Sequence, residues 1–96
     1  MKVKRRIKIK NRQGLHARPA SLFVKIANRY DAEVTVKKGG ESVNGKSIMG
    51  LMTLAANHGS ILEIHTSGPE AVQVMDELVQ FLLNDSEEDP KKGSAS

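Results

Sequence analysis

The chain has 96 residues and no cysteine, which leaves room for one domain with a modest core and excludes a disulfide framework and a thiolate metal site. Its net charge of +4 would suit a nucleic acid, but only 3% of the residues are aromatic, so few side chains could stack on bases and we expect no nucleic-acid partner. No apolar run approaches the roughly 18 residues that span a bilayer, so we expect a cytoplasmic protein without membrane insertion.

The first two predicted elements are a strand and a helix. Residues 2–10 alternate, with Val3, Ile7 and Ile9 on one side and cations on the other, which is typical of a half-buried strand. Beyond Gly14 the period changes, and a helix is predicted over residues 17–29. Its apolar face consists of Ala20, Phe23, Val24, Ala27 and Tyr30.

A hairpin and a short helix come next. Residues 33–38 alternate again, Gly39-Gly40 is a two-residue turn signal, and residues 41–43 form the return strand. Ser47 is then expected to be the N-cap of a brief helix over residues 48–55. This helix is apolar nearly all round, and a domain this small cannot easily cover both of its sides. The side that we expect to be exposed carries Ile48, Met49 and Met52.

The last two elements are a strand over residues 61–66 and, after the break at Gly68-Pro69, a helix over residues 70–83. The apolar set of this helix is Ala71, Met75, Leu78 and Leu82, widened by Val72, Val74 and Val79.

Four strands and three amphipathic helices fit one architecture economically. This is an α+β, open-faced β-sandwich with a four-stranded antiparallel sheet and three helices on one face, in the order β-α-β-β-α-β-α. Residues 1–84 would form this single domain. Residues 85–96 are rich in charged residues, Pro, Gly and Ser, which predicts a disordered polar tail.

Reactive chemistry is concentrated in the heptapeptide from Gly14 to Ala20. Gly14 allows a sharp turn after the strand, and Pro19 suits the first turn of a helix, so His16 lies at a helix entrance. The backbone amides of Ala17 and Arg18 would cradle an anion there, and the Arg18 guanidinium suits phosphate oxygens. A nucleophilic ring nitrogen beside a phosphate cradle predicts a histidine that carries a phosphoryl group. The other histidines, His58 and His65, complete no metal-ligand spacing, so we expect no metal and no other cofactor.

Two motifs resemble one known family. His16-Ala17-Arg18-Pro19 resembles the phosphorylation-site motif of the HPr family, the histidine-containing phosphocarriers of the bacterial phosphoenolpyruvate-dependent sugar phosphotransferase system. Residues 44–52, Asn-Gly-Lys-Ser-Ile-Met-Gly-Leu-Met, resemble the family's other signature, around its regulatory serine. The resemblance runs from about Ile7 to Leu83 and implies the same open-faced fold.

The resemblance also implies roles for individual residues. His16 would be phosphorylated on its pros nitrogen, Nδ1, by the first enzyme of the system and dephosphorylated by sugar-specific transport components. Arg18 would stabilise the phosphate, and Ser47 would be the target of an HPr kinase/phosphorylase. Such a protein is a phosphoryl carrier and not a complete enzyme, and we expect it to be a monomer that docks its partners through the exposed side of the short helix. A catalytically silent relative that lacks the histidine is excluded, because His16 is present.

Two alternatives stay open. The nitrogen-related branch of the system uses a carrier with the same histidine chemistry and a regulatory output, and the identity of the first enzyme would separate the two branches. A basic RNA-binding module, using the cations of the first strand, is the remote alternative. It predicts tight binding that falls steeply with salt.

Overall fold

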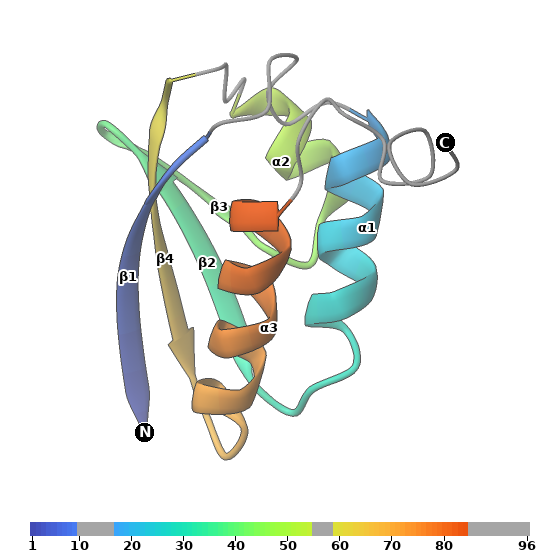
Figure 1. Ribbon diagram of the computed structural model, residues 1–96, viewed down its shortest axis with the longest axis vertical. Coiled ribbons are helices and arrows are strands. Elements are labelled where there is room, and N and C mark those ends of the chain that lie inside the picture. The colour runs from blue at the N-terminus through green and yellow to red at the C-terminus, as the bar shows by residue number, and fades with distance from the viewer. Residues whose placement is uncertain (10–16, 55–58, 85–96) are drawn as a thin grey trace.

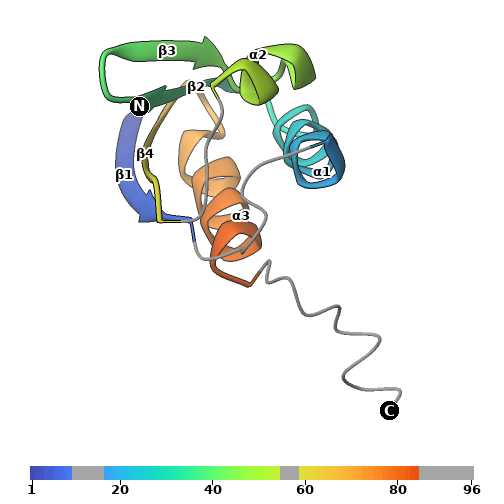
Figure 2. The same cartoon turned by 90° about the horizontal axis from the view of Figure 1, so that it is seen from above.

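The computed structural model describes residues 1–9, 17–54 and 59–84. Its elements follow the predicted order: β1 (Lys2–Lys8), α1 (Ala17–Ala27), β2 (Glu33–Lys38), β3 (Glu41–Asn44), α2 (Ile48–Thr53), β4 (Ile61–Ser67) and α3 (Ala71–Asn84). The four strands form one antiparallel sheet in the order β1-β4-β2-β3. The three helices lie on one side of this curved sheet (Figures 1 and 2), which confirms the open-faced architecture.

The core lies between the sheet and the helices. Strand β4 occupies a central position, and its side chains alternate, so that Leu62, Ile64 and Thr66 are buried while their neighbours reach toward solvent. Thr66 is the one buried polar residue among those described, and its hydroxyl donates to the Ala71 carbonyl at 2.8 Å. From the helices and the C-cap of α2, the largest fully buried side chains are those of Phe23, Leu51, Leu54, Met75 and Leu78.

Polar contacts fix the C-terminal end of α1 against α3. The Glu77 carboxylate accepts from Arg29 Nη1 at 2.7 Å and from the Tyr30 hydroxyl. Directly before α3, Glu70 Oε1 accepts from the Asp31 amide at 2.7 Å, and the Glu70 amide donates to the Asp31 carbonyl at 3.1 Å. The segment after α1 is therefore held by main-chain and side-chain bonds together.

Three predicted ends were too long. β1 stops at Lys8 because the Ile9 carbonyl accepts from Gly59 and not from its ladder partner Ser60, which breaks the regular pairing. α1 stops at Ala27 because the Arg29 amide bonds to the Ile26 carbonyl three residues back, a tighter turn than the α-helix allows. α2 stops at Thr53, and residue 55 lies outside the described residues.

Smaller differences concern other ends and one side chain. β3 and β4 each extend one residue beyond the prediction, and α3 begins and ends one residue later. Val72, predicted to widen the buried face of α3, is 42% exposed. The inward face follows residues 71, 74, 75, 78 and 82, and Val72 lies about 100° away from it around the helix. The expected tail, 85–96, lies outside the described residues.

Candidate functional site

The N-terminal end of α1 carries the part of the phosphorylation motif that the structure describes. Ala17 and Arg18 open the helix and are exposed, whereas Pro19 is buried. Proline fits this first turn because the amide that it lacks would have no intrahelical partner there. Its burial, with that of Ala20 and Phe23, anchors the helix entrance to the core. His16 lies outside the described residues, so the structure places its chain neighbour Ala17 but not its ring.

Ser47 is the N-cap of α2, as predicted. Its backbone is extended, with φ −118° and ψ 116°, and its Oγ accepts from the Gly50 amide at 3.0 Å. The Ser47 carbonyl in turn accepts the first helical bond, from the Leu51 amide at 3.0 Å. The hydroxyl oxygen therefore already has a structural partner, and the side chain is half-buried.

The two sides of α2 differ sharply in exposure. Leu51 is fully buried and Leu54 is 2% exposed, so the inner side packs into the core. Met49 is 75% exposed, Met52 42% and Ile48 40%. We call these three side chains the α2 apolar patch. Large apolar side chains gathered on one exposed side are typical of a contact surface for a partner.

The helices that carry the two motifs pack against each other. α1 packs against α2, and α2 packs against β3. Figure 1 shows α2 at the same end of the molecule as the N-terminal turn of α1. The exposed Arg18 and the α2 apolar patch therefore lie on two helices that pack against each other, and Arg18 is near the start of the helix that follows His16 in the chain.

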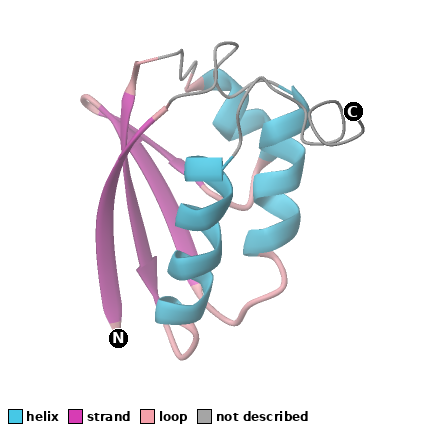
Figure 3. Cartoon of the chain, in the orientation of Figure 1, coloured by secondary structure: helices cyan, strands magenta, loops and turns pink. Residues whose placement is uncertain are grey.

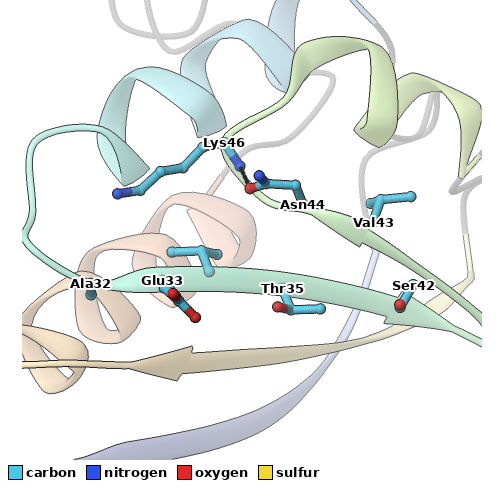
Figure 4. Close-up of a pocket in the computed structure, with 8 residues that line it drawn as sticks. Ala32, Glu33, Thr35, Ser42, Val43, Asn44 and Lys46 are labelled. Atoms are coloured by element: carbon cyan, nitrogen blue, oxygen red, sulfur yellow. Dashed lines mark hydrogen bonds between the residues drawn. The ribbon is translucent and has the colours of Figure 1, made fainter.

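Asn44 and Lys46 hold the turn before α2, a role that goes beyond those expected from the sequence. Asn44 Oδ1 accepts from the Lys46 amide at 2.8 Å, and the Lys46 ammonium donates to the Tyr30 carbonyl at 3.3 Å. An Asn side chain bonding two residues ahead is a recurring turn device, so the Asn-Gly pair was the available signal. The same residues, with Thr35, line an open hollow of about 480 Å³ along β2 and β3 (Figure 4). Neither Arg18 nor Ser47 lines it, so it is separate from these two candidate site residues.

Two further properties of the described residues bear on function. None of their clusters of His, Asp and Glu could hold a metal ion. None of the helices within the described residues is both long enough and apolar enough to cross a membrane.

Comparisons with known proteins place the chain in a family. The family described as "PTS HPr component phosphorylation site" matches residues 3–84. The HPr-like protein Crh of Halalkalibacterium halodurans is 44% identical over 80 residues, which cover 83% of this chain and 95% of that protein.

Solved structures agree with this assignment. The phosphocarrier protein HPr of Bacillus anthracis is 42% identical with a TM-score of 0.81, covering 84% of this chain and 96% of that one. An HPr dimer from Thermoanaerobacter tengcongensis is 39% identical with a TM-score of 0.68, covering 80% and 88% of the two chains. This chain belongs to the HPr family of phosphocarriers of the phosphotransferase system.

Proposed function

We propose that this protein accepts a phosphoryl group on Nδ1 of His16 from the phosphoenolpyruvate-dependent first enzyme and passes it to sugar-specific transport components. The observation that carries the proposal is that the motif directly after His16 opens a helix with an exposed first turn, and that this helix packs against the one that carries the α2 apolar patch. A carrier needs this combination, since two different proteins must each reach the same nitrogen.

The chemistry is a displacement at phosphorus. The lone pair of neutral Nδ1 forms the new P–N bond while the bond from phosphorus to the donor breaks and its electron pair stays with the donor atom. Transfer to the acceptor repeats this sequence with His16 as the leaving group. Positioning and electrostatics supply most of the catalysis of such transfers. In this protein the Arg18 guanidinium and the first amides of α1 would offset the phosphoryl charge.

The α2 apolar patch is the proposed docking surface for both partners. Two of its three side chains are methionines, which are flexible and polarizable and can adapt to differently shaped surfaces. A carrier that meets a donor and several acceptors benefits from this adaptability.

Regulatory phosphorylation of Ser47 would act on this docking surface. A phosphate there adds nearly two negative charges directly before Ile48 and Met49. An acidic or apolar partner surface would then have to approach or desolvate that charge, which weakens the encounter. HPr kinase/phosphorylase is the proposed enzyme for this step.

We further propose that the working form is a cytoplasmic monomer. One carrier chain contains both the motif and the docking surface, so transfer needs no second copy. Sedimentation equilibrium at micromolar concentration should give the mass of one chain, whereas a dimer like that of the Thermoanaerobacter tengcongensis relative would contradict the proposal.

The decisive experiment follows the phosphoryl group. The protein is incubated with phosphoenolpyruvate and the first enzyme of the sugar branch, and in a parallel reaction with that of the nitrogen-related branch. We expect one acid-labile phosphoryl group, located on His16 by mass spectrometry and abolished by His16→Ala. Label on His58 or His65 would overturn the proposal, and faster transfer from the nitrogen-branch enzyme would reassign the branch.

A matched pair of variants tests the docking surface. Met52 on α2 and Val72 on α3 are both 42% exposed, and Figure 1 shows them on elements that start at opposite ends of the molecule. Met52→Glu should slow transfer from the first enzyme at least tenfold, while Val72→Glu leaves the rate unchanged and both keep the wild-type Tm within a few degrees. Equal rates for the two variants would remove the α2 apolar patch from the docking surface.

A further inference from the structure

Strand β1 leaves one side of its backbone without a strand partner. It is the first strand in the sheet order and pairs with β4 alone among the described residues. The Ile9 amide donates to the Ser60 carbonyl at 2.8 Å, and the Met1 carbonyl accepts from Gly68 at 2.9 Å. Because backbone groups alternate in direction along an antiparallel strand, odd-numbered residues bond toward β4. The N–H and C=O groups of Lys2, Lys4, Arg6 and Lys8 therefore point to the outer edge.

The same four residues place their side chains on the open face of the sheet. Ile7 and Ile9 are buried toward the helices, and the strand alternates, so the even-numbered cations face the other way and all are exposed. Figure 3 shows that no helix covers this side of the sheet. Alternate residues of a strand are about 6.7 Å apart, so the four cations form a row roughly 20 Å long. We call this row the β1 cationic edge.

The four cations of the β1 cationic edge outnumber the carboxylates beside them on the open face, which are those of Glu63 and Glu33. Across the ladder, Lys4 faces His65 and Arg6 faces Glu63, and His65 Nε2 bonds to Glu63 Oε1 at 2.9 Å. The hydrogen bond from His65 and the nearby charges of Lys4 and Arg6 hold the pKa of Glu63 below its usual range. A shallow hollow of about 310 Å³ opens on this face, and its charged or titratable lining consists of Lys2, Lys4, His65 and the Glu33 carboxylate.

We infer that the β1 cationic edge binds an extended acidic peptide segment of a partner protein, which joins the sheet as a fifth strand. An antiparallel segment would exchange backbone hydrogen bonds with Lys2, Lys4, Arg6 and Lys8. Residues directly opposite one another share a face, so the side chains bonded to these positions lie beside the cations. Carboxylates at alternate positions of the segment complement this row.

Other occupants fit less well. A second copy pairing through β1 would set lysines and arginines against one another, and such charges on edge strands discourage self-association. A single-stranded nucleic acid would meet the cations but no stacking platform, because Phe23 is buried on the helix side and Tyr30 and Phe81 pack against the same core. The edge presents N–H and C=O groups in alternation, a pattern that an extended polypeptide backbone matches along its length.

This inference is independent of the proposed phosphoryl transfer. The β1 cationic edge lies on the open face, away from α1 and α2, so an added strand leaves the α2 apolar patch uncovered (Figure 2). A protein that binds the peptide but receives no phosphoryl group would sink only the proposed function. Transfer without peptide binding would sink only the inference.

The test is an NMR titration of the wild-type protein with the capped heptapeptide Glu-Val-Glu-Val-Glu-Val-Glu. We expect the largest shift changes, and slower solvent exchange, at the amides of Lys4 and Arg6. The control peptide carries N-methyl groups on its glutamate amides, which removes the backbone donors and keeps every charge. It should lose most of the binding.

A pair of neighbouring variants separates this site from diffuse attraction. Arg6→Gln should weaken binding by up to about fivefold, the upper end of the range for one opposite-charge cross-strand pair. Arg5→Gln removes the same charge one residue away, where the backbone bonds to β4, and should leave the affinity unchanged. Equal losses for both variants would overturn the inference. The inference would also be overturned if the N-methylated peptide, or an oligothymidylate of seven nucleotides, bound as tightly as the unmodified peptide.

Discussion

Among the described glycines, Gly45 is the one at which an added methyl group should destabilise the fold most. A Cβ at this buried glycine would lie 2.4 Å from Cγ1 of Val34 and 3.2 Å from the Val34 carbonyl oxygen. The Gly45 amide also donates to that carbonyl at 2.8 Å, so the two backbones cannot separate without breaking a bond. Val34 is 3% exposed and β-branched, and its side chain has little freedom to rotate away.

Overpacking of this kind costs about 1–3 kcal/mol, which exceeds the gain of roughly 0.4–1 kcal/mol from a less flexible unfolded chain. Gly45→Ala should therefore lower the free energy of unfolding in a urea titration and lower Tm by about 4–8 °C for each kcal/mol lost. Gly40→Ala is the matched control, because its Cβ would meet nothing within 4 Å and its φ is not positive, so it should be neutral or slightly stabilising.

A double mutant completes this test. Val34→Ala removes the colliding Cγ1 atom, so adding Gly45→Ala to that background should cost clearly less than it does alone. If Gly45→Ala and Gly40→Ala unfold at the same urea concentration, the close approach of Gly45 to Val34 is not a constraint and the steric argument is refuted.

Three further outcomes are expected. Ser47→Ala should cost about 1 kcal/mol of stability through the lost cap and leave transfer to His16 nearly normal, whereas Ser47→Asp should slow transfer. If both variants transfer at the same rate, capping the helix is the only role of Ser47. Thr66→Val should cost about 0.5–1.5 kcal/mol by urea unfolding, because the bond to the Ala71 carbonyl is lost, and a neutral result would contradict that role. The Tyr30 hydroxyl lowers the pKa of Glu77, and its bond to Glu77, together with partial burial, raises that of Tyr30. Glu77→Gln should therefore lower the free energy of unfolding most near neutral pH. The loss should shrink as the pH falls below the ordinary Glu pKa of 4.5, and it should shrink again as the pH rises above the ordinary Tyr pKa of 10.0. A loss that stays constant across this pH range would argue against the pair.

The periodic elements could be predicted because each buries one face. Strands with alternating Val and Ile, and helices with apolar residues at helical spacing, leave one arrangement in which all those faces meet. The ends were harder, because they depend on single bonds between distant segments. Nothing local to Arg29 indicates that its amide bonds to Ile26, and the carboxylate that tethers its side chain comes from Glu77, 48 residues away.

The candidate site likewise has features that could be predicted from the sequence and features that could not. The N-cap role of Ser47 follows from its place before an apolar run, and its bond to Gly50 confirms it. The exposure of Met49 could be anticipated from a helix that is apolar on all sides. The bond from Lys46 to the Tyr30 carbonyl could not be anticipated, because it joins two turns that only the folded sheet brings together. The placement of the His16 ring relative to Arg18 stays a prediction.

The signature over residues 44–52 therefore combines two kinds of residue. Asn44, Gly45 and Lys46 are occupied by the turn, through a side-chain bond, a close approach to Val34 and a bond to the Tyr30 carbonyl. Their match to the family motif is evidence for the fold and says little about phosphorylation. Met49 is 75% exposed and makes no comparable contact in the core, so burial does not account for its match, and the proposed docking surface would. Ser47 stands between the two groups. Its cap bond to the Gly50 amide is sufficient reason for a serine at this position, whether or not a kinase acts on it. Regulation at Ser47 is therefore tested by the rate of transfer from a partner and not by the stability of the fold.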